Sequence, residues 1–115
     1  MNPKYRISFY KTLQGKGVVE EYIKKQHPRT VAKIINTLDL LKEYGFSLLG
    51  THWMKKIHNH PDLYELRVKT INEYRFIFSF KDNLFTILSG FEKKKQKIPK
   101  NEIDLSMQRY RENTT

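Results

Sequence analysis

Two arginines interrupt segments that are otherwise typical of β-strands. The stretch LYELRVKTINEYRFIFSF covers residues 63–80 and contains Arg67 in its first half and Arg75 in its second half. Side chains alternate across a strand, so Arg75 lies opposite the aromatic row of its own segment. If the segments pair across a turn, Arg67 and Arg75 share the face away from the core and lie close enough to bind one phosphate. A solvated face, in which Glu65 pairs with an arginine, is the alternative.

Lysines add a second group of cations near these arginines. Two lie on an earlier predicted strand and five follow Phe91: Lys55, Lys56, Lys93, Lys94, Lys95, Lys97 and Lys100. Lysines neutralise phosphates, and an aromatic ring such as that of Phe91 can stack on an unpaired base, so the pattern is typical of RNA binding. An ordinary solvated lysine cluster is the alternative interpretation of this run.

The charge balance favours a polyanionic partner. The chain has 115 residues, with 22 Lys and Arg against 12 Asp and Glu, which gives a formal net charge of +10. Nucleic acid, an acidic protein or an anionic membrane face would each suit that charge. The chain contains no cysteine, which excludes disulfides, and no apolar stretch of the ~20 residues that a membrane span needs. We therefore expect a cytoplasmic protein in which residues 1–115 form a single domain.

The histidines do not predict a metal site. His58 and His60 are spaced to share a strand face, with His52 and Asp62 nearby, but Asn59 and Pro61 break strand geometry between them. The chain also lacks a glycine-rich phosphate loop and a nucleophilic serine elbow. We predict no metal and no other cofactor.

Hydrophobic periodicity predicts the elements that position these side chains. Helices are expected at residues 18–26, 28–44 and 99–113, and strands at 5–10, 51–57, 63–68, 73–80 and 84–91. The second helix has the strongest signals, because Pro28 suits its first position and Gly45 its C-terminal cap. Its apolar stripe consists of Val31, Ile34, Ile35, Leu38 and Leu41. The prediction is an α+β fold, with two N-terminal helices packed on an antiparallel sheet, a C-terminal helix, and the helices on one face.

Three segments of the chain resemble a known family. The motifs LYELR, EYRFIFSF and GFEKKKQKIPKNEI occur in this order, and the chain resembles the HigB group of the RelE-like toxins of type II toxin-antitoxin systems most strongly over residues 55–103. The resemblance implies a RelE-type fold and a ribosome-dependent mRNA endonuclease that inhibits translation. It implies a cognate antitoxin, HigA-like and of the helix-turn-helix type, besides the ribosome and mRNA. Operator DNA would be bound only through the antitoxin, and no membrane is implied.

The same resemblance implies roles for individual residues. Arg67 and Arg75 fall where RelE-like enzymes have basic catalytic groups on two strands, and Lys93 matches a third such position. Lys55 and Lys56 match a preceding basic site, with Lys94, Lys95 and Lys97 extending the RNA surface. The chain departs from RelE in two ways. Ile98 and Pro99 occupy the region of its C-terminal tyrosine, and Glu65 stands where RelE has a lysine.

The resemblance further implies metal-independent RNA cleavage through the 2′-hydroxyl. Arg67 and Arg75 would hold and neutralise the scissile phosphate, and Lys93 would donate a proton or hydrogen bond to the leaving oxygen. Glu65 is either the general base or the group that orients an arginine. Two alternatives remain open at this point: a non-enzymatic toxin on the same fold that inhibits DNA gyrase, similar to ParE, and a basic ribosome- or RNA-binding module without catalysis.

Overall fold

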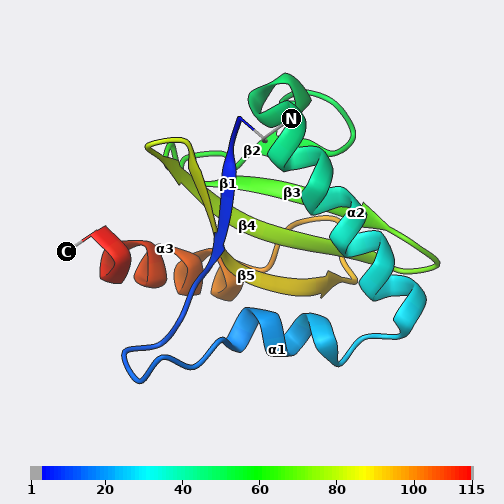
Figure 1. The fold of residues 1–115 in the computed structure, drawn as a ribbon, viewed down its shortest axis with the longest axis horizontal. Coiled ribbons are helices and arrows are strands. Elements are labelled where there is room, and N and C mark those ends of the chain that lie inside the picture. Colours follow the sequence, from blue (N-terminus) through cyan, green and yellow to red (C-terminus); the bar gives the residue numbers. More distant parts are fainter. Residues whose placement is uncertain (1–3, 115) are drawn as a thin grey trace.

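The structure is a computed structural model that describes residues 4–114. These residues form a five-stranded sheet with helices on both sides (Figure 1). The ends of the expected 1–115 domain, residues 1–3 and 115, lie outside the described residues. The elements are β1 Arg6–Phe9, α1 Val18–Lys24, α2 Pro28–Tyr44, the 3-10 helix η1 Gly45–Leu48, β2 Met54–Lys56, β3 Tyr64–Lys69, β4 Glu73–Lys81, β5 Leu84–Lys93 and α3 Lys100–Thr114.

The strand order is β1-β5-β4-β3-β2. Strands β2 to β5 form the predicted antiparallel meander, and its last hairpin turns at Asp82 and Asn83 with φ of 54° and 61°, as a two-residue turn requires. Strand β1 departs from the expected antiparallel sheet because it pairs parallel to β5. No hairpin joins β1 to its neighbour, so hairpin spacing in the sequence carries no information about its direction.

Helix α2 begins and ends where the sequence predicts. Pro28 is its first residue, His27 Nδ1 accepts a hydrogen bond from the Arg29 amide at 3.1 Å, and Gly45 ends the helix with φ of 52°. The buried side of α2 packs on one sheet face in a core that includes Ile34, Leu38, Leu41, Phe76, Phe78 and Phe85. The predicted apolar stripe is therefore confirmed for Val31, Ile34, Leu38 and Leu41, whereas Ile35 is 49% exposed.

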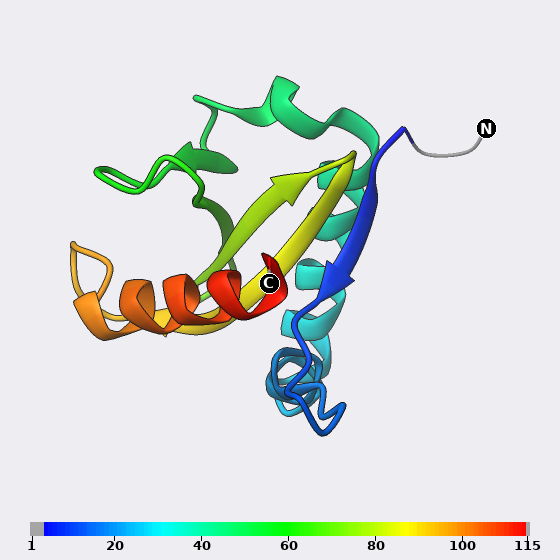
Figure 2. The same cartoon turned by 90° about the vertical axis from the view of Figure 1, so that its left-hand side faces the viewer.

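The expectation that all helices cover one face of the sheet is wrong. Helix α3 lies on the side opposite to α1 and α2 (Figure 2). Its predicted apolar residues Ile103, Met107 and Tyr110 pack on a second core formed by Ile57, Leu63, Ile77, Leu88 and Phe91. The sheet is apolar on both faces, so each face needs its own helical cover.

An irregularity in the β4–β5 pairing contributes to this second core. Ile77 pairs with Ser89 while Phe78 pairs with Ile87, so Leu88 is an extra residue on β5. The bulge adds Leu88 to the face that α3 covers. The Ser89 and Ser106 hydroxyls, 3.0 Å apart and buried, then join β5 to α3.

The second strand and the first helix are shorter than predicted. Strand β2 begins at Met54 rather than Thr51, because the Thr51 hydroxyl oxygen accepts a hydrogen bond from the Trp53 amide at 3.2 Å and forms a turn. Helix α1 ends at Lys24 rather than Gln26. Among residues 4–114, no helix combines the length and apolar character that a membrane crossing requires.

The neighbours Ile34 and Ile35 on α2 test this packing. Ile34 is 0% exposed, so Ile34→Ala should cost about 2–5 kcal/mol of unfolding free energy by removing packed atoms and leaving a cavity. The half-exposed Ile35 is the matched control, and Ile35→Ala should change stability by under about 1 kcal/mol. Urea unfolding would measure both variants. Equal losses would mean that α2 packs through another side.

Candidate functional site

Strand register brings the predicted cations to one face of the sheet. Arg67 on β3 is the direct cross-strand partner of Arg75 on β4, and Lys55 on β2 is the partner of Glu65. Paired residues, and residues two apart on one strand, point to the same side. Lys55, Glu65, Arg67 and Arg75 therefore share the face that α3 partly covers.

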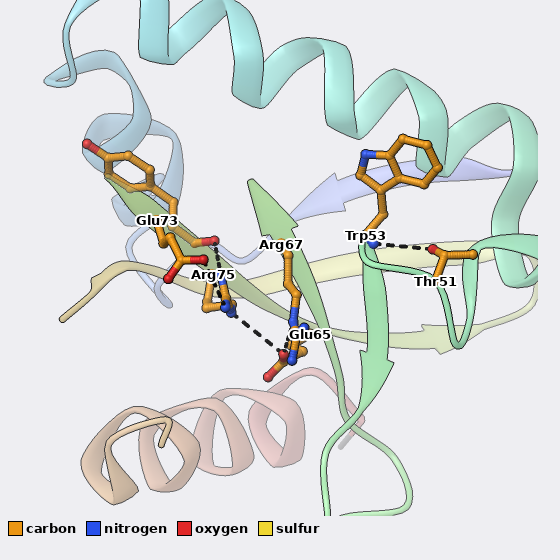
Figure 3. Close-up of polar contacts among 7 residues, drawn as sticks. Thr51, Trp53, Glu65, Arg67, Glu73 and Arg75 are labelled. Atoms are coloured by element: carbon orange, nitrogen blue, oxygen red, sulfur yellow. Dashed lines mark hydrogen bonds and ion pairs between the residues drawn. The ribbon is translucent and has the colours of Figure 1, made fainter. Parts of the chain in front are cut away.

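A buried carboxylate lies at the centre of this group (Figure 3). Glu65 is 6% exposed, and its Oε1 accepts a hydrogen bond from Arg67 Nε at 2.6 Å. The same oxygen lies 3.6 Å from Arg75 Nε. Glu65 thus ties the arginines of two strands together, which favours the orienting role among the two roles expected for it.

Arg75 is not at an open surface, in contrast to its expected position. It is 4% exposed, its Nη1 donates to the Tyr74 carbonyl at 3.2 Å, and its Nη2 lies 3.9 Å from Glu73 Oε1. Burial lowers the pKa of the guanidinium, and the nearby Glu65 carboxylate acts in the opposite direction. The side chain of Arg67 is 29% exposed, so Arg67 is the more accessible of the two arginines for a ligand.

A hollow of about 420 Å³ brings six of the predicted site residues together. We call it the basic hollow, and its charged lining consists of Lys55, Lys56, Glu65, Arg67, Lys93 and Lys97. Ile57, Ile98 and Ile103 supply apolar wall between these groups. The lysines come from β2 and from the end of β5 with its following loop, so two segments of the chain place positive charge in the hollow that Arg67 lines. Such a concave, cationic surface suits a phosphodiester.

Other predicted residues lie away from this hollow. Phe91 is 7% exposed and belongs to the second core, so its expected role as a stacking surface for RNA does not fit its position. Its side chain is needed to pack against α3, which the sequence pattern did not reveal. Lys94 and Lys95 are exposed on the loop between β5 and α3, outside the hollow's lining.

A second hollow, of about 360 Å³, lies on the other side of Arg67. It is lined by Lys33, Thr37, His52, Trp53, Arg67, Lys69, Glu73 and Arg75. The sequence pattern pointed to His52 only as a possible metal ligand and did not point to Lys33, Trp53 or Lys69. The available signal was the His-Trp pair directly before a basic strand. Among residues 4–114, no three His, Asp or Glu side chains are grouped in a way that could hold a metal ion.

Comparisons with known proteins agree with this architecture. A family model described as "Phage derived protein Gp49-like (DUF891)" matches residues 21–111. A chain of the archaeal RelE-RelB complex from Pyrococcus horikoshii is similar in structure, with a TM-score of 0.56, 18% identity and coverage of 80% of this chain and 98% of that chain.

A second solved structure gives the same result. A chain of the toxin-antitoxin complex RelBE2 from Mycobacterium tuberculosis has a TM-score of 0.55 and 18% identity, covering 79% of this chain and 99% of that chain. A search of curated proteins found no match. The expected RelE-type α+β fold is confirmed by these likenesses.

The coupling between Glu65 and Arg75 can be measured by a double-mutant cycle. Arg75→Met should cost about 1–3 kcal/mol of unfolding free energy, because it removes a cationic partner from the buried Glu65 carboxylate. The variant with both Arg75→Met and Glu65→Met should lose less than the sum of the two single losses. Lys69→Met, at an exposed position of β3, is the control and should change stability by under about 0.5 kcal/mol. Strictly additive losses would show that the two groups are not coupled.

Proposed function

The chain belongs to the Gp49-like family of phage-derived proteins, and from this membership and its RelE-like fold we propose that it is a type II toxin of the HigB group that cleaves mRNA on the ribosome. The observation that carries the proposal is the basic hollow, where lysines from two segments surround an accessible arginine held by a buried carboxylate. A single-stranded RNA backbone has the charge and the flexibility to enter such a site.

The proposed reaction uses the RNA's own 2′-hydroxyl and needs no metal. The 2′-oxygen attacks the adjacent phosphorus as its proton passes to a solvent water molecule, and the bond from phosphorus to the 5′-oxygen breaks. The products are a 2′,3′-cyclic phosphate and a 5′-hydroxyl, which gains a proton. The protein must align the attack and stabilise the negative charge that develops on the phosphorus oxygens.

Arg67 and Lys93 are the proposed catalytic residues. Arg67 can present its remaining N–H groups to the phosphate while its Nε–H stays bonded to Glu65, which fixes the guanidinium plane. Lys93 lines the same hollow and would donate a hydrogen bond or proton to the leaving 5′-oxygen. The Glu65 Oε1 atom is already shared between two arginines, so we assign Glu65 to orientation rather than proton abstraction.

Arg75 takes a different part from the one expected for it. Arg75 is buried and its Nε lies 3.6 Å from Glu65 Oε1, so it would act on the phosphate through the positions of Glu65 and Arg67 rather than by direct contact. The remaining lysines, Lys55, Lys56, Lys94, Lys95 and Lys97, would bind the RNA backbone and position the substrate. The ribosome would supply the rest of the alignment, because an exposed lysine surface fixes little geometry by itself.

A cognate antitoxin is the proposed protein partner. The two similar structures described above are toxin-antitoxin complexes, which supports a partner that holds this chain inactive. We propose a HigA-like antitoxin with a helix-turn-helix domain, so that operator DNA is bound through the antitoxin and not through this chain. The net charge of +10 would favour rapid, salt-sensitive association with such a partner if it presents an acidic surface.

Substitution of Arg67 tests the nuclease proposal. With purified ribosomes and a translated mRNA, Arg67→Ala should reduce cleavage about a hundredfold or more, because one donor to the developing phosphate charge is lost. Arg67→Lys should recover only part of the activity, since an ammonium cannot donate both to Glu65 and to the phosphate in a fixed plane.

The matched control is Lys81→Ala, which removes an exposed cation at the far end of β4 and should leave cleavage unchanged. Thermal melting would establish that each variant is folded. Full cleavage by a folded Arg67→Ala protein would contradict the assignment. A wild-type protein that leaves mRNA intact but blocks supercoiling by DNA gyrase would favour the ParE-like alternative.

A further inference from the structure

The second hollow differs from the basic hollow because it is built around aromatic rings. The His52 and Trp53 rings lie 4.0 Å apart between centroids and are inclined at 39°. His52 is exposed, whereas Trp53 is half-buried and packs against the first core. The core therefore holds Trp53 in place, and the exposed His52 ring lies beside it. Both rings line the second hollow, which we call the aromatic hollow. Rigid aromatic surfaces of this kind bind the faces of nucleobases.

The strand arrangement keeps the aromatic hollow open. Strand β2 pairs with Tyr64–Leu66 of β3, and the Arg67 amide donates to the Trp53 carbonyl at 2.7 Å. Strand β3 continues to Lys69 beyond this last contact with the β2 segment. Lys33 and Thr37, one turn apart on α2, form the opposite wall. The hollow lies between the residues that directly precede β2, the edge of β3 and the side of α2.

The charges around the hollow favour an anionic ligand. Lys33 and Lys69 are exposed on two sides of it, Arg67 and Arg75 lie in its wall, and Glu73 is its one acidic lining residue. Arg75 is 4% exposed and its Nε lies 3.6 Å from Glu65 Oε1, so it contributes charge to the wall and not a donor that a ligand can reach.

We propose that the aromatic hollow is a second nucleotide subsite, in which a base of single-stranded RNA stacks on His52 and Trp53 while Lys33 and Lys69 bind its phosphate. This inference rests on the proposed nuclease function, because Arg67 lines both hollows and would place the cleaved phosphodiester next to this subsite. Its volume of about 360 Å³ lies within the range of small-ligand sites. Stacking accepts any base, so the subsite contributes affinity and alignment more than sequence preference.

The chain carries its own probe for this subsite, since Trp53 is its only tryptophan. The ligand would be a short 2′-O-methyl RNA of mixed sequence, which cannot be cleaved through the 2′-oxygen. Saturable quenching of Trp53 fluorescence is the expected result. An oligomer of equal length and charge without bases should bind weakly and leave the fluorescence unchanged, because it can make the phosphate contacts but cannot stack.

Two exposed side chains allow the subsite to be weakened without disturbing the core. His52→Ala should reduce the affinity for the 2′-O-methyl RNA roughly fivefold or more, the lower end of what loss of base stacking costs. Lys69→Ala should weaken binding and reduce its dependence on salt concentration. Lys81→Ala is the control with an unchanged affinity. Trp53→Phe, checked by melting, should retain part of the binding because the smaller ring still stacks.

Assays of mRNA cleavage on the ribosome distinguish an error in the subsite proposal from an error in the nuclease proposal. If the subsite exists, His52→Ala should raise KM for mRNA more than it lowers kcat. The subsite would be overturned, and the nuclease proposal left intact, if the wild-type protein cleaves mRNA but RNA does not quench Trp53. The same conclusion would follow if the wild-type protein cleaves mRNA but neither His52→Ala nor Lys69→Ala changes the RNA affinity. Quenching of Trp53 in a protein that cleaves no mRNA would overturn the nuclease and retain RNA binding at this hollow. Quenching by an antitoxin but not by RNA would assign the hollow to protein binding and overturn the proposal.

Discussion

The buried carboxylate of Glu65 determines the positions of the two arginine side chains on this face of the sheet. Its Oε1 accepts from Arg67 Nε at 2.6 Å and lies 3.6 Å from Arg75 Nε, so one oxygen joins two strands through two guanidiniums. A buried anion is tolerable only with cationic partners, and a buried arginine has the same need of an anion. The three side chains therefore depend on one another. Arg67 gains a fixed orientation that a surface arginine with free rotamers would lack.

The packing of α3 on the second face of the sheet determines which of these charged side chains a ligand can reach. Helix α3 covers the second core with Ile103, Met107 and Tyr110. Its first turn also supplies Ile103 to the wall of the basic hollow, together with Ile98 from the preceding loop. The same helix thus closes the apolar part of the face and forms one side of the opening beside Arg67. Arg75 is 4% exposed and borders the aromatic hollow, whereas Lys55 and Lys93 line the basic hollow.

The two hollows provide different kinds of binding surface around one arginine. The basic hollow has flexible lysines at its rim, which suit a phosphate chain of variable path. The aromatic hollow has Trp53 anchored against the first core and His52 beside it, which suit a flat base. Charge alone attracts any polyanion, and shape and ring contacts distinguish a single strand from a duplex. The combination is consistent with the single-stranded substrate proposed for this family member.

The sequence by itself determined the elements whose signals are local. Pro28 and Gly45 marked the ends of α2, the three residues between the predicted strands 73–80 and 84–91 marked the last hairpin, and strand alternation predicted that Arg67 and Arg75 face the same side. Each of these depends on a few neighbouring residues, whose backbone preferences and spacing can be read directly from the chain.

Only the tertiary structure decided the features that depend on residues far apart in the chain. Packing between distant segments produces four such features: the parallel pairing of β1 with β5, the bulge at Leu88, the position of α3, and the burial of Phe91 and Arg75. The aromatic hollow likewise joins Lys33 of α2 with Trp53 and Lys69. Alternation predicts that two side chains share a face, but whether that face is solvated or covered is decided by which helix finds enough apolar surface to pack against it.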